Sequence, residues 1–365
     1  MAIFYPLPAL LYILIRQSAI LGFSTYSHMR GRPMDLEPVI YWGDSLLARM
    51  PQRCLGWLQF SVPPVLKTAF LGLSFRSPLV ASSFKDDPGM LLFWYHLGLG
   101  SVIYKTVLTA KREGNPCPRI QDLGDKGLIN AMGLPGSGVH ALVSDIETGR
   151  NPLFAGVSPL GLSIGGETPE DYRQVFDALN AALSRPDVFF EVNISCPNTD
   201  EGQSLLAHPE LLGALLVYMR ARTDRVIGVK LSPDQSNESL CRFADILKRV
   251  PRVYVNLGNT QYRKCESVGL PMAALSRGGG GLSGALLFPR TLEMLTLLRP
   301  YGIPMMATGG ISTPAQALAA LAAGAGLVGM ATALVKNPFI VPKMLTAISE
   351  AYSHANPIPN KTGTG

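Results

Sequence analysis

Short apolar runs alternate with amphipathic stretches of helical length from Ser77 onward. This alternation predicts repeated βα units around a parallel sheet. The eight predicted strands are 78–82, 101–105, 154–162, 189–194, 226–231, 253–257, 304–308 and 326–330. The predicted helices are 88–96, 138–148, 169–183, 209–223, 236–249, 288–298, 314–323 and 338–351. Eight strands predict an α/β fold of the (β/α)8 TIM barrel type, because an open doubly wound sheet of six would require two strands to be wrong.

The chain before this repeat lacks its rhythm. We expect an N-terminal helical extension at 1–70, a barrel at 71–352 and a flexible C-terminal tail at 353–365, with extension helices at 10–21, 38–49 and 51–60. The first 23 residues are strongly apolar, but prolines and the pair Arg16-Gln17 interrupt them. The pattern favours a helix that lies in the membrane interface, or one that packs on the protein's own body, over a spanning helix or a cleaved signal.

Composition and charge argue against a nucleic-acid partner and give no support to a metal site. With 365 residues, 47% of them hydrophobic and 16% charged, the chain can bury one large core. The net charge of +6 suits anionic ligands or an acidic membrane surface, but the basic residues are scattered, so we predict no nucleic-acid partner. Five cysteines without a CxxC pair fit a reducing compartment, and five histidines without an HxxxH pattern give no support to a metal site.

Polar side chains gather where the predicted strands end, which is the face that carries the chemistry of such barrels. They include three lysines and four asparagines, namely Lys85, Lys105, Lys230, Asn130, Asn193, Asn198 and Asn259. Any one asparagine could be a turn former and any one lysine a solvated charge. Together they predict a floor that suits a flat ligand with carbonyl groups and a carboxylate.

The last two units are expected to supply glycine-rich turns at strand ends, at 280–284 (GGLSG), 308–311 (TGGI) and 329–332 (GMAT). Glycine lets backbone N–H groups approach a phosphate, and the start of a following helix favours negative charge. Glycine also serves ordinary tight turns. The position of these segments after the late strands nevertheless predicts a phosphate site.

Seven segments stand out by their order and spacing along the chain. They are KTVLTAKREGNPCPR at 105–119, NAMGLP at 130–135, EVNISCPNT at 191–199, GVKLSP at 228–233, Asn259-Thr260, GGLSG and TGGI. In order and spacing these segments resemble the dihydroorotate dehydrogenase family, and the likeness covers about residues 71–350.

The resemblance implies that FMN lies across the barrel mouth. The residues expected to contact it are Ala81, Ser82, Thr106, Asn193, Lys230, Gly258, Gly284, Gly309, Gly310, Ala331 and Thr332. Those expected to bind substrate are Asn130, Met132, Gly133, Leu134, Asn193, Asn198, Asn259 and Thr260. The two main branches of the family use different lysines for the substrate carboxylate, and this chain matches both, at Lys85 and at Lys105.

The reaction implied by the resemblance is oxidation of dihydroorotate to orotate in pyrimidine synthesis, with Cys196 as the base and hydride transfer to flavin N5. A free thiol is mostly protonated at neutral pH, so nearby lysines or hydrogen bonds should help to form the thiolate. A small buried cysteine is the alternative for such a residue, but Cys196 lies in a polar loop between Asn193 and Asn198.

The chain mixes features of the two branches. Cys196 and NAMGLP resemble the soluble class 1 enzymes, whereas the apolar N-terminus and Lys85 resemble the membrane-associated class 2 enzymes that reduce quinone. The electron acceptor, a quinone or another compound, therefore stays open, and so does the oligomeric state. We expect a peripheral protein on the cytoplasmic side of the membrane, with a soluble cytoplasmic protein as the alternative.

Two further positions depart from the family pattern. Gly136 and Ser163 each replace an asparagine. A related FMN barrel that oxidises a different cyclic amide therefore stays open, as does a flavin- or ligand-binding barrel without catalysis. A third alternative, a structural membrane-anchored protein, predicts no bound chromophore.

Overall fold

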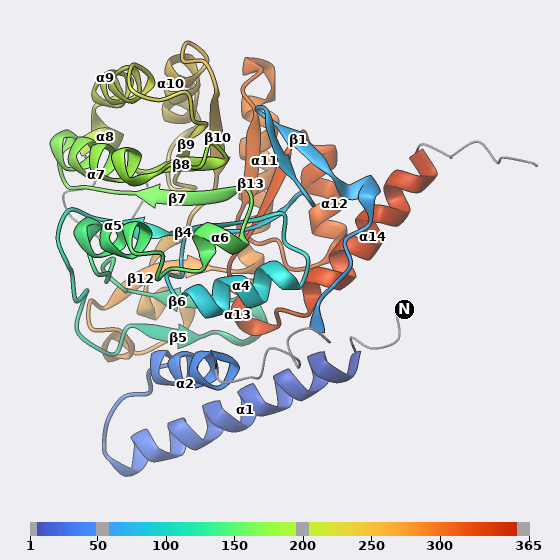
Figure 1. Ribbon diagram of the computed structural model, residues 1–365. Coiled ribbons are helices and arrows are strands. Elements are labelled where there is room, and N and C mark those ends of the chain that lie inside the picture. Colours follow the sequence, from blue (N-terminus) through green and yellow to red (C-terminus); the bar gives the residue numbers. More distant parts are fainter. Residues whose placement is uncertain (1–5, 49–57, 195–203, 356–365) are drawn as a thin grey trace, which may run out of the picture.

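Eight parallel strands close into a barrel in the computed structural model, which describes residues 6–48, 58–194 and 204–355 (Figure 1). The TIM-barrel prediction is confirmed. In order around the barrel the strands are β10 (Val253–Leu257), β13 (Met305–Thr308), β14 (Leu327–Met330), β3 (Leu79–Ala81), β4 (Ser101–Val107), β7 (Leu160–Ile164), β8 (Val188–Asn193) and β9 (Ile227–Leu231).

Helices follow the barrel strands along the chain and surround them (Figure 1). They are α4 (Pro88–His96), α5 (Val139–Glu147), α6 (Leu153–Gly156), α7 (Pro169–Ala182), α8 (Ser204–Ala207), α9 (Pro209–Arg220), α10 (Asn237–Leu247), α11 (Phe288–Leu298), α12 (Pro314–Ala322), α13 (Thr332–Lys336) and α14 (Ile340–Ala355). Thr168 and Thr313 begin α7 and α12 with capping boxes, each followed by proline at the first helical position, which explains why these two starts are readable from sequence.

One predicted strand is partly wrong. The run 154–162 divides into the short helix α6 and the strand β7, which begins only at Leu160. Asn151 Oδ1 accepts a hydrogen bond from the backbone N–H of Leu153 and so starts a helical turn, and Pro159 has no N–H to donate to a strand ladder. Short apolar runs cannot be assigned to helix or strand from periodicity alone.

A hairpin that the sequence did not predict plugs the amino end of the barrel. It consists of β1 (Thr68–Phe70) and β2 (Leu73–Phe75). Phe70 and Phe75 pack against inward side chains of several barrel strands, among them Phe189 and Tyr254. This end is therefore closed by apolar side chains, and the opposite end is left for ligands.

A second sheet lies over the carboxyl ends of the strands. Its order is β11 (Gln261–Lys264), β12 (Gly279–Ser283), β6 (Leu128–Asn130) and β5 (Ile120–Asp122). The segment GGLSG is therefore mainly a strand, which corrects its prediction as a glycine-rich turn. A Cβ at Gly280 would lie 2.2 Å from the Asn130 carbonyl oxygen, and one at Gly281 would lie 2.1 Å from Thr260 Oγ1, so these glycines permit close strand packing.

The N-terminal extension lies beside this second sheet, at the end of the molecule opposite the hairpin (Figure 1). Its described helices are α1 (Pro6–Met29) and α2 (Glu37–Ala48), and α1 extends beyond the predicted 10–21 at both ends. Tyr12 OH donates to the Val335 carbonyl at 3.0 Å, and Arg16 pairs with Asp122 at 2.6 Å. These contacts attach α1 to the barrel.

The predicted helix at 51–60 falls mostly outside the described residues. The predicted division at residue 70, and the tail from residue 353, stay predictions, although α14 continues to Ala355. Short 3-10 helices complete the described elements: η1 (Pro64–Leu66), η2 (Gly124–Lys126), η3 (Cys265–Val268), η4 (Met272–Ala274), η5 (Ala285–Leu287) and η6 (Arg299–Tyr301).

Candidate active site

A cavity of about 490 Å³ occupies the carboxyl end of the barrel, beneath the second sheet and α2. Parallel strands of a barrel all end on the same face, so residues far apart in the sequence meet there. The predicted site residues that line the cavity are Ser82, Lys85, Lys105, Thr106, Asn130, Met132, Leu134, Asn193, Lys230, Asn259, Thr260, Gly284, Gly309, Gly310, Ala331 and Thr332.

Three predicted contacts do not line this cavity. Ala81 is buried in the core between the barrel and its helices. A Cβ at Gly133 would lie 2.8 Å from the backbone nitrogen of Asn115, and one at Gly258 would lie 1.4 Å from the Thr308 carbonyl oxygen. Close packing of the chain therefore requires glycine at both positions, and their contact with a ligand stays a prediction. The predicted base Cys196 and the predicted ligand Asn198 lie outside the described residues.

The polar floor is joined by side-chain hydrogen bonds. Asn193 Nδ2 donates to Thr106 Oγ1 at 2.9 Å, and Thr106 Oγ1 lies 3.0 Å from Ser163 Oγ. Tyr172 OH also donates to the Asn193 carbonyl at 2.9 Å. Ser163 therefore takes part in orienting the floor through Thr106, and its departure from the family's asparagine leaves a connected polar network in place.

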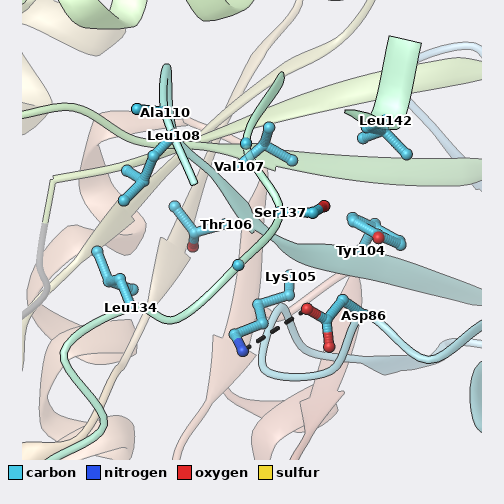
Figure 2. A pocket seen from close by; sticks show the side chains of 12 residues that line it. Asp86, Tyr104, Lys105, Thr106, Val107, Leu108, Ala110, Leu134, Ser137 and Leu142 are labelled. Carbon is cyan, nitrogen blue, oxygen red and sulfur yellow. Dashed lines mark ion pairs between the residues drawn. The ribbon is translucent and has the colours of Figure 1, made fainter. Parts of the chain in front are cut away.

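The two lysines considered for a substrate carboxylate differ in their partners. Lys85 forms an ion pair with Asp44 of α2, and both side chains are largely buried. Lys105 Nζ lies 3.8 Å from Asp86, whose side chain is 40% exposed; Figure 2 shows the two side chains facing each other. Burial lowers the pKa of Lys105, Asp86 opposes that effect, and the nearby Lys85 adds to it. Lys105 is thus the ammonium with more to gain from an anionic ligand.

The innermost part of the cavity offers further polar groups. Lys230 is buried and donates to Ser83 Oγ at 3.3 Å. Ser82 Oγ and Thr308 Oγ1 are buried hydroxyls without a hydrogen-bond partner among the described residues. Buried hydroxyls usually have a partner, so this pair fits a cavity that holds a polar ligand.

The glycines at the late strands fit the approach of a polar group to backbone. Gly309 and Gly310 have φ of 128° and 74°, which side chains rarely adopt, and both line the cavity. A Cβ at Gly310 would lie 2.4 Å from the backbone nitrogen of Phe288, the first residue of α11. The chain therefore brings bare backbone and the start of a long helix to the same wall, which suits a phosphate.

Residues of α2 also line the cavity, and sequence reasoning missed them. They are Glu37, Ile40 and Tyr41. Burial opposes ionisation of Glu37, but its ion pair with Arg119 holds the pKa of that carboxyl below its usual range. The sequence predicted a helix at 38–49 but did not indicate which part of the barrel it covers.

Gly136 lies beside the main cavity, at a small adjoining space of about 10 Å³ that Lys105, Thr106 and Leu134 also line (Figure 2). A Cβ at Gly136 would meet nothing within 4 Å. Packing therefore does not require glycine at position 136. Because glycine has no side chain, the small space that Lys105 also lines stays open on this side.

Comparison with known proteins decides the family. The sequence profile described as dihydroorotate dehydrogenase matches residues 65–351. The chain belongs to the dihydroorotate dehydrogenase family. Members of this family are flavin-dependent oxidoreductases, and the chain is therefore an oxidoreductase of this kind.

Two relatives show how similar the chain is to named proteins. It is 32% identical to dihydroorotate dehydrogenase (quinone) of Clavibacter michiganensis, over 84% of this chain and 92% of the relative. It is 29% identical to the catalytic subunit of dihydroorotate dehydrogenase B (NAD(+)) of Listeria innocua, over 76% and 90%. The fold is similar to a crystal structure from Eimeria tenella described as DHODH in complex with ferulenol, with a TM-score of 0.75 at 20% identity over 88% of this chain and 93% of that one.

Proposed function

We propose that this protein oxidises dihydroorotate to orotate in pyrimidine biosynthesis, with FMN as its cofactor and a quinone as the electron acceptor. The observation that carries the proposal is the large cavity at the carboxyl end of the described barrel. It is lined by four lysines, four asparagines and glycines of the late strands, all within residues 65–351 that match the family.

FMN would supply the hydride acceptor of the reaction. Lys230, Ser82, Thr106 and Asn193 would hold its ring system, because they form the polar inner part of the cavity. Its phosphate would meet the wall formed by Gly284, Gly309, Gly310, Ala331 and Thr332. The hydroxyls of Ser82 and Thr308, which have no hydrogen-bond partner within the described part of the chain, support a polar occupant in this part of the cavity.

Dihydroorotate would lie against the amide-rich side of the cavity, where Asn130, Asn193, Asn259 and Thr260 can pair with its carbonyl and N–H groups. We assign its carboxylate to Lys105. Lys85 already has Asp44 as a close partner, whereas the only ion pair of Lys105 among the described residues is the longer one with Asp86.

Cys196 would remove the proton next to the carbonyl, as the family pattern EVNISCPNT implies. Its thiolate is the reactive form, and the ammonium groups of the cavity would favour that form. The proton would pass to the sulfur while the hydride leaves the adjacent carbon.

The assignment of quinone rests on the relatives named as quinone enzymes and on the apolar side of the cavity near the extension. Ile40, Val335 and Ile340 line that side, close to α1 and α2. By length and composition, α1 is the one helix of the described chain that could cross a membrane, yet Arg16 and Tyr12 attach it to the barrel. We therefore propose peripheral attachment at the cytoplasmic side of a membrane.

Anaerobic spectroscopy tests the proposal. The purified protein should be yellow, and its flavin absorbance should bleach on addition of dihydroorotate and return with a ubiquinone analogue. Cys196→Ala should retain the yellow colour and lose the bleaching, because the base is gone while the cavity remains. Bleaching that persists in Cys196→Ala would remove the base assignment.

Other outcomes would favour the alternatives. A yellow wild type that binds orotate but is not bleached by dihydroorotate would support a binding protein. Bleaching by another cyclic amide alone would support a different substrate. Recovery with fumarate or NAD, but not with quinone, would remove the acceptor assignment.

A further inference from the structure

The barrel interior contains a charged side chain that has no place in the chemistry described above. Along β8, alternate residues point inward, so Phe189, Glu191 and Asn193 lie at successive depths. Phe189 belongs to the apolar plug at the amino end, and Asn193 lines the cavity. Glu191 is fully buried between them, directly below the cavity floor.

Both oxygens of Glu191 accept hydrogen bonds. Oε1 accepts from Ser83 Oγ at 2.8 Å, and Oε2 accepts from Asn256 Nδ2 at 2.7 Å and from Tyr254 OH at 3.3 Å. Two oxygens that act only as acceptors are the pattern of an ionised carboxylate. No ion pair joins Glu191 directly to a lysine, arginine or histidine of the described chain, so its charge is balanced through other groups.

Ser83 connects this carboxylate to the cavity. A serine hydroxyl has one proton to donate, and an ammonium group can only donate. Ser83 Oγ therefore accepts from Lys230 Nζ at 3.3 Å and donates to Glu191. The two hydrogen bonds therefore run in one direction, from Lys230 through Ser83 to Glu191. Ser83 and Lys230 both line the cavity.

A buried charge is costly unless other groups compensate it, and here the two opposite charges lie one hydroxyl apart. Removing the carboxylate would leave the positive charge of Lys230 uncompensated at the cavity floor. Tyr254 occupies the space beside Gly228 on β9, where a Cβ would lie 2.2 Å from the Tyr254 ring, so the tyrosine keeps the opposite side of the carboxylate closed.

We infer that Glu191 is a positioning residue, which through Ser83 holds the Lys230 ammonium at the cavity floor and limits the positive potential that a bound flavin experiences. The inference rests on the proposed function only in taking the occupant to be a flavin. It concerns the reduction potential of that flavin rather than the identity of the substrate.

The test compares Glu191→Gln with the wild-type holoenzyme. Glutamine keeps the shape, and its amide can donate to Asn256 Oδ1, a buried oxygen without a partner among the described residues. A negatively charged reduced flavin should then be stabilised by the uncompensated Lys230. We expect the ratio of reduced to oxidised flavin at a fixed ambient potential to rise about tenfold, which is about 30 mV for a two-electron couple.

Tyr254→Phe is the matched control, because it removes a hydrogen bond to the same carboxylate but leaves the charge and the Ser83 link. It should lower the Tm and leave the flavin potential unchanged. Ser83→Ala keeps the carboxylate and breaks the link, so it should give a smaller shift in the same direction, and it serves if Glu191→Gln does not fold.

The potential is measured with dithionite and a reference dye, so it does not depend on dihydroorotate as the substrate. Unchanged potentials in Glu191→Gln, or in Ser83→Ala where the first variant does not fold, would overturn the inference while leaving the proposed reaction intact. A shift of equal size in Tyr254→Phe would also overturn it, since packing would then explain the effect. A wild type that is not bleached by dihydroorotate would overturn the reaction alone.

Discussion

Lys85 and Lys105 illustrate how two similar residues acquire different roles from their surroundings. Both stand at carboxyl ends of neighbouring strands, and the backbone N–H of Lys105 donates to the Lys85 carbonyl at 3.0 Å. Asp44 of α2 forms an ion pair with Lys85. Burial raises the pKa of Asp44, although the attraction of Lys85 opposes this effect. The extension therefore selects which ammonium is available to a ligand.

We predict that Lys105→Met weakens orotate binding about 10- to 100-fold, because a hydrogen bond to a charged group contributes about 1.5–3 kcal/mol. Binding is measured from the change in the flavin spectrum on titration with orotate. Lys85→Met is the matched control and should lower the Tm, since Asp44 loses its partner, with little effect on orotate affinity. The reverse ranking of the two variants would show that Lys85 holds the carboxylate.

The assignment of the substrate carboxylate to Lys105 also predicts how kcat/KM depends on pH. Substrate binding needs the protonated ammonium, and burial places the pKa of free Lys105 below the usual lysine value. The kcat/KM of the wild type should therefore fall as the pH rises through that lowered pKa, since this parameter reports groups of the free enzyme. An alkaline limb that persists unchanged in Lys105→Met would belong to another group.

Most of the described residues that the sequence named as site candidates do line the cavity, because the ends of strands are readable from sequence. Sequence reasoning could not find Ser83 and Glu191 as partners, since both depend on which face of a strand points inward and on how neighbouring strands are staggered. It also could not anticipate Asp44, because the docking of α2 depends on packing rather than on periodicity. Cys196 lies outside the described residues, so its role stays a prediction.

At the scale of elements, the barrel strands were predictable because apolar runs and helical stretches repeat with regular spacing. The second sheet was not, because β5 and β6 have three residues each, β11 is polar, and β12 begins with three glycines. Such segments form strands only where tertiary contacts supply partners. The hairpin β1–β2 was missed because its two strands also have only three residues each, and it closes the amino end of the barrel.

We predict that Phe75→Ala destabilises the protein by about 3–5 kcal/mol, because the ring is buried in the plug and its removal leaves a cavity. Denaturant unfolding followed by circular dichroism measures the change. Ser74→Ala, at the exposed position next to it, should stay within about 0.5 kcal/mol of wild type. Because the plug is at the opposite end from the ligand cavity, the flavin spectrum of folded Phe75→Ala should match the wild type; an altered spectrum would contradict this separation of the two ends.

At the scale of the whole molecule, the extension gives the protein one apolar face that its own body does not cover. Leu7, Leu10, Leu14 and Leu21 are between 52% and 70% exposed and follow spacings of three, four and seven residues, which place them on one side of α1. Tyr12, Arg16 and Phe23 on the other side contact the barrel, its second sheet or α2. The helix thus lies along the protein with its leucines outward, which is the arrangement of a helix resting in a membrane interface.

We predict that Leu10→Ser combined with Leu14→Ser lowers binding to phosphatidylglycerol-containing vesicles by about tenfold or more, since each leucine buried in lipid contributes about 1.5–3 kcal/mol. Co-sedimentation of the holoprotein with the vesicles measures the bound fraction. Val217→Ser is the control, because Val217 is 64% exposed on α9, which lies on the opposite side of the molecule from α1 (Figure 1). Anaerobic flavin bleaching by dihydroorotate should be unchanged in the leucine variant, because neither leucine lines the cavity. Equal vesicle binding by all three proteins would mean that the exposed leucines do not contact lipid, and the quinone would then have to reach the cavity without the attachment proposed for α1.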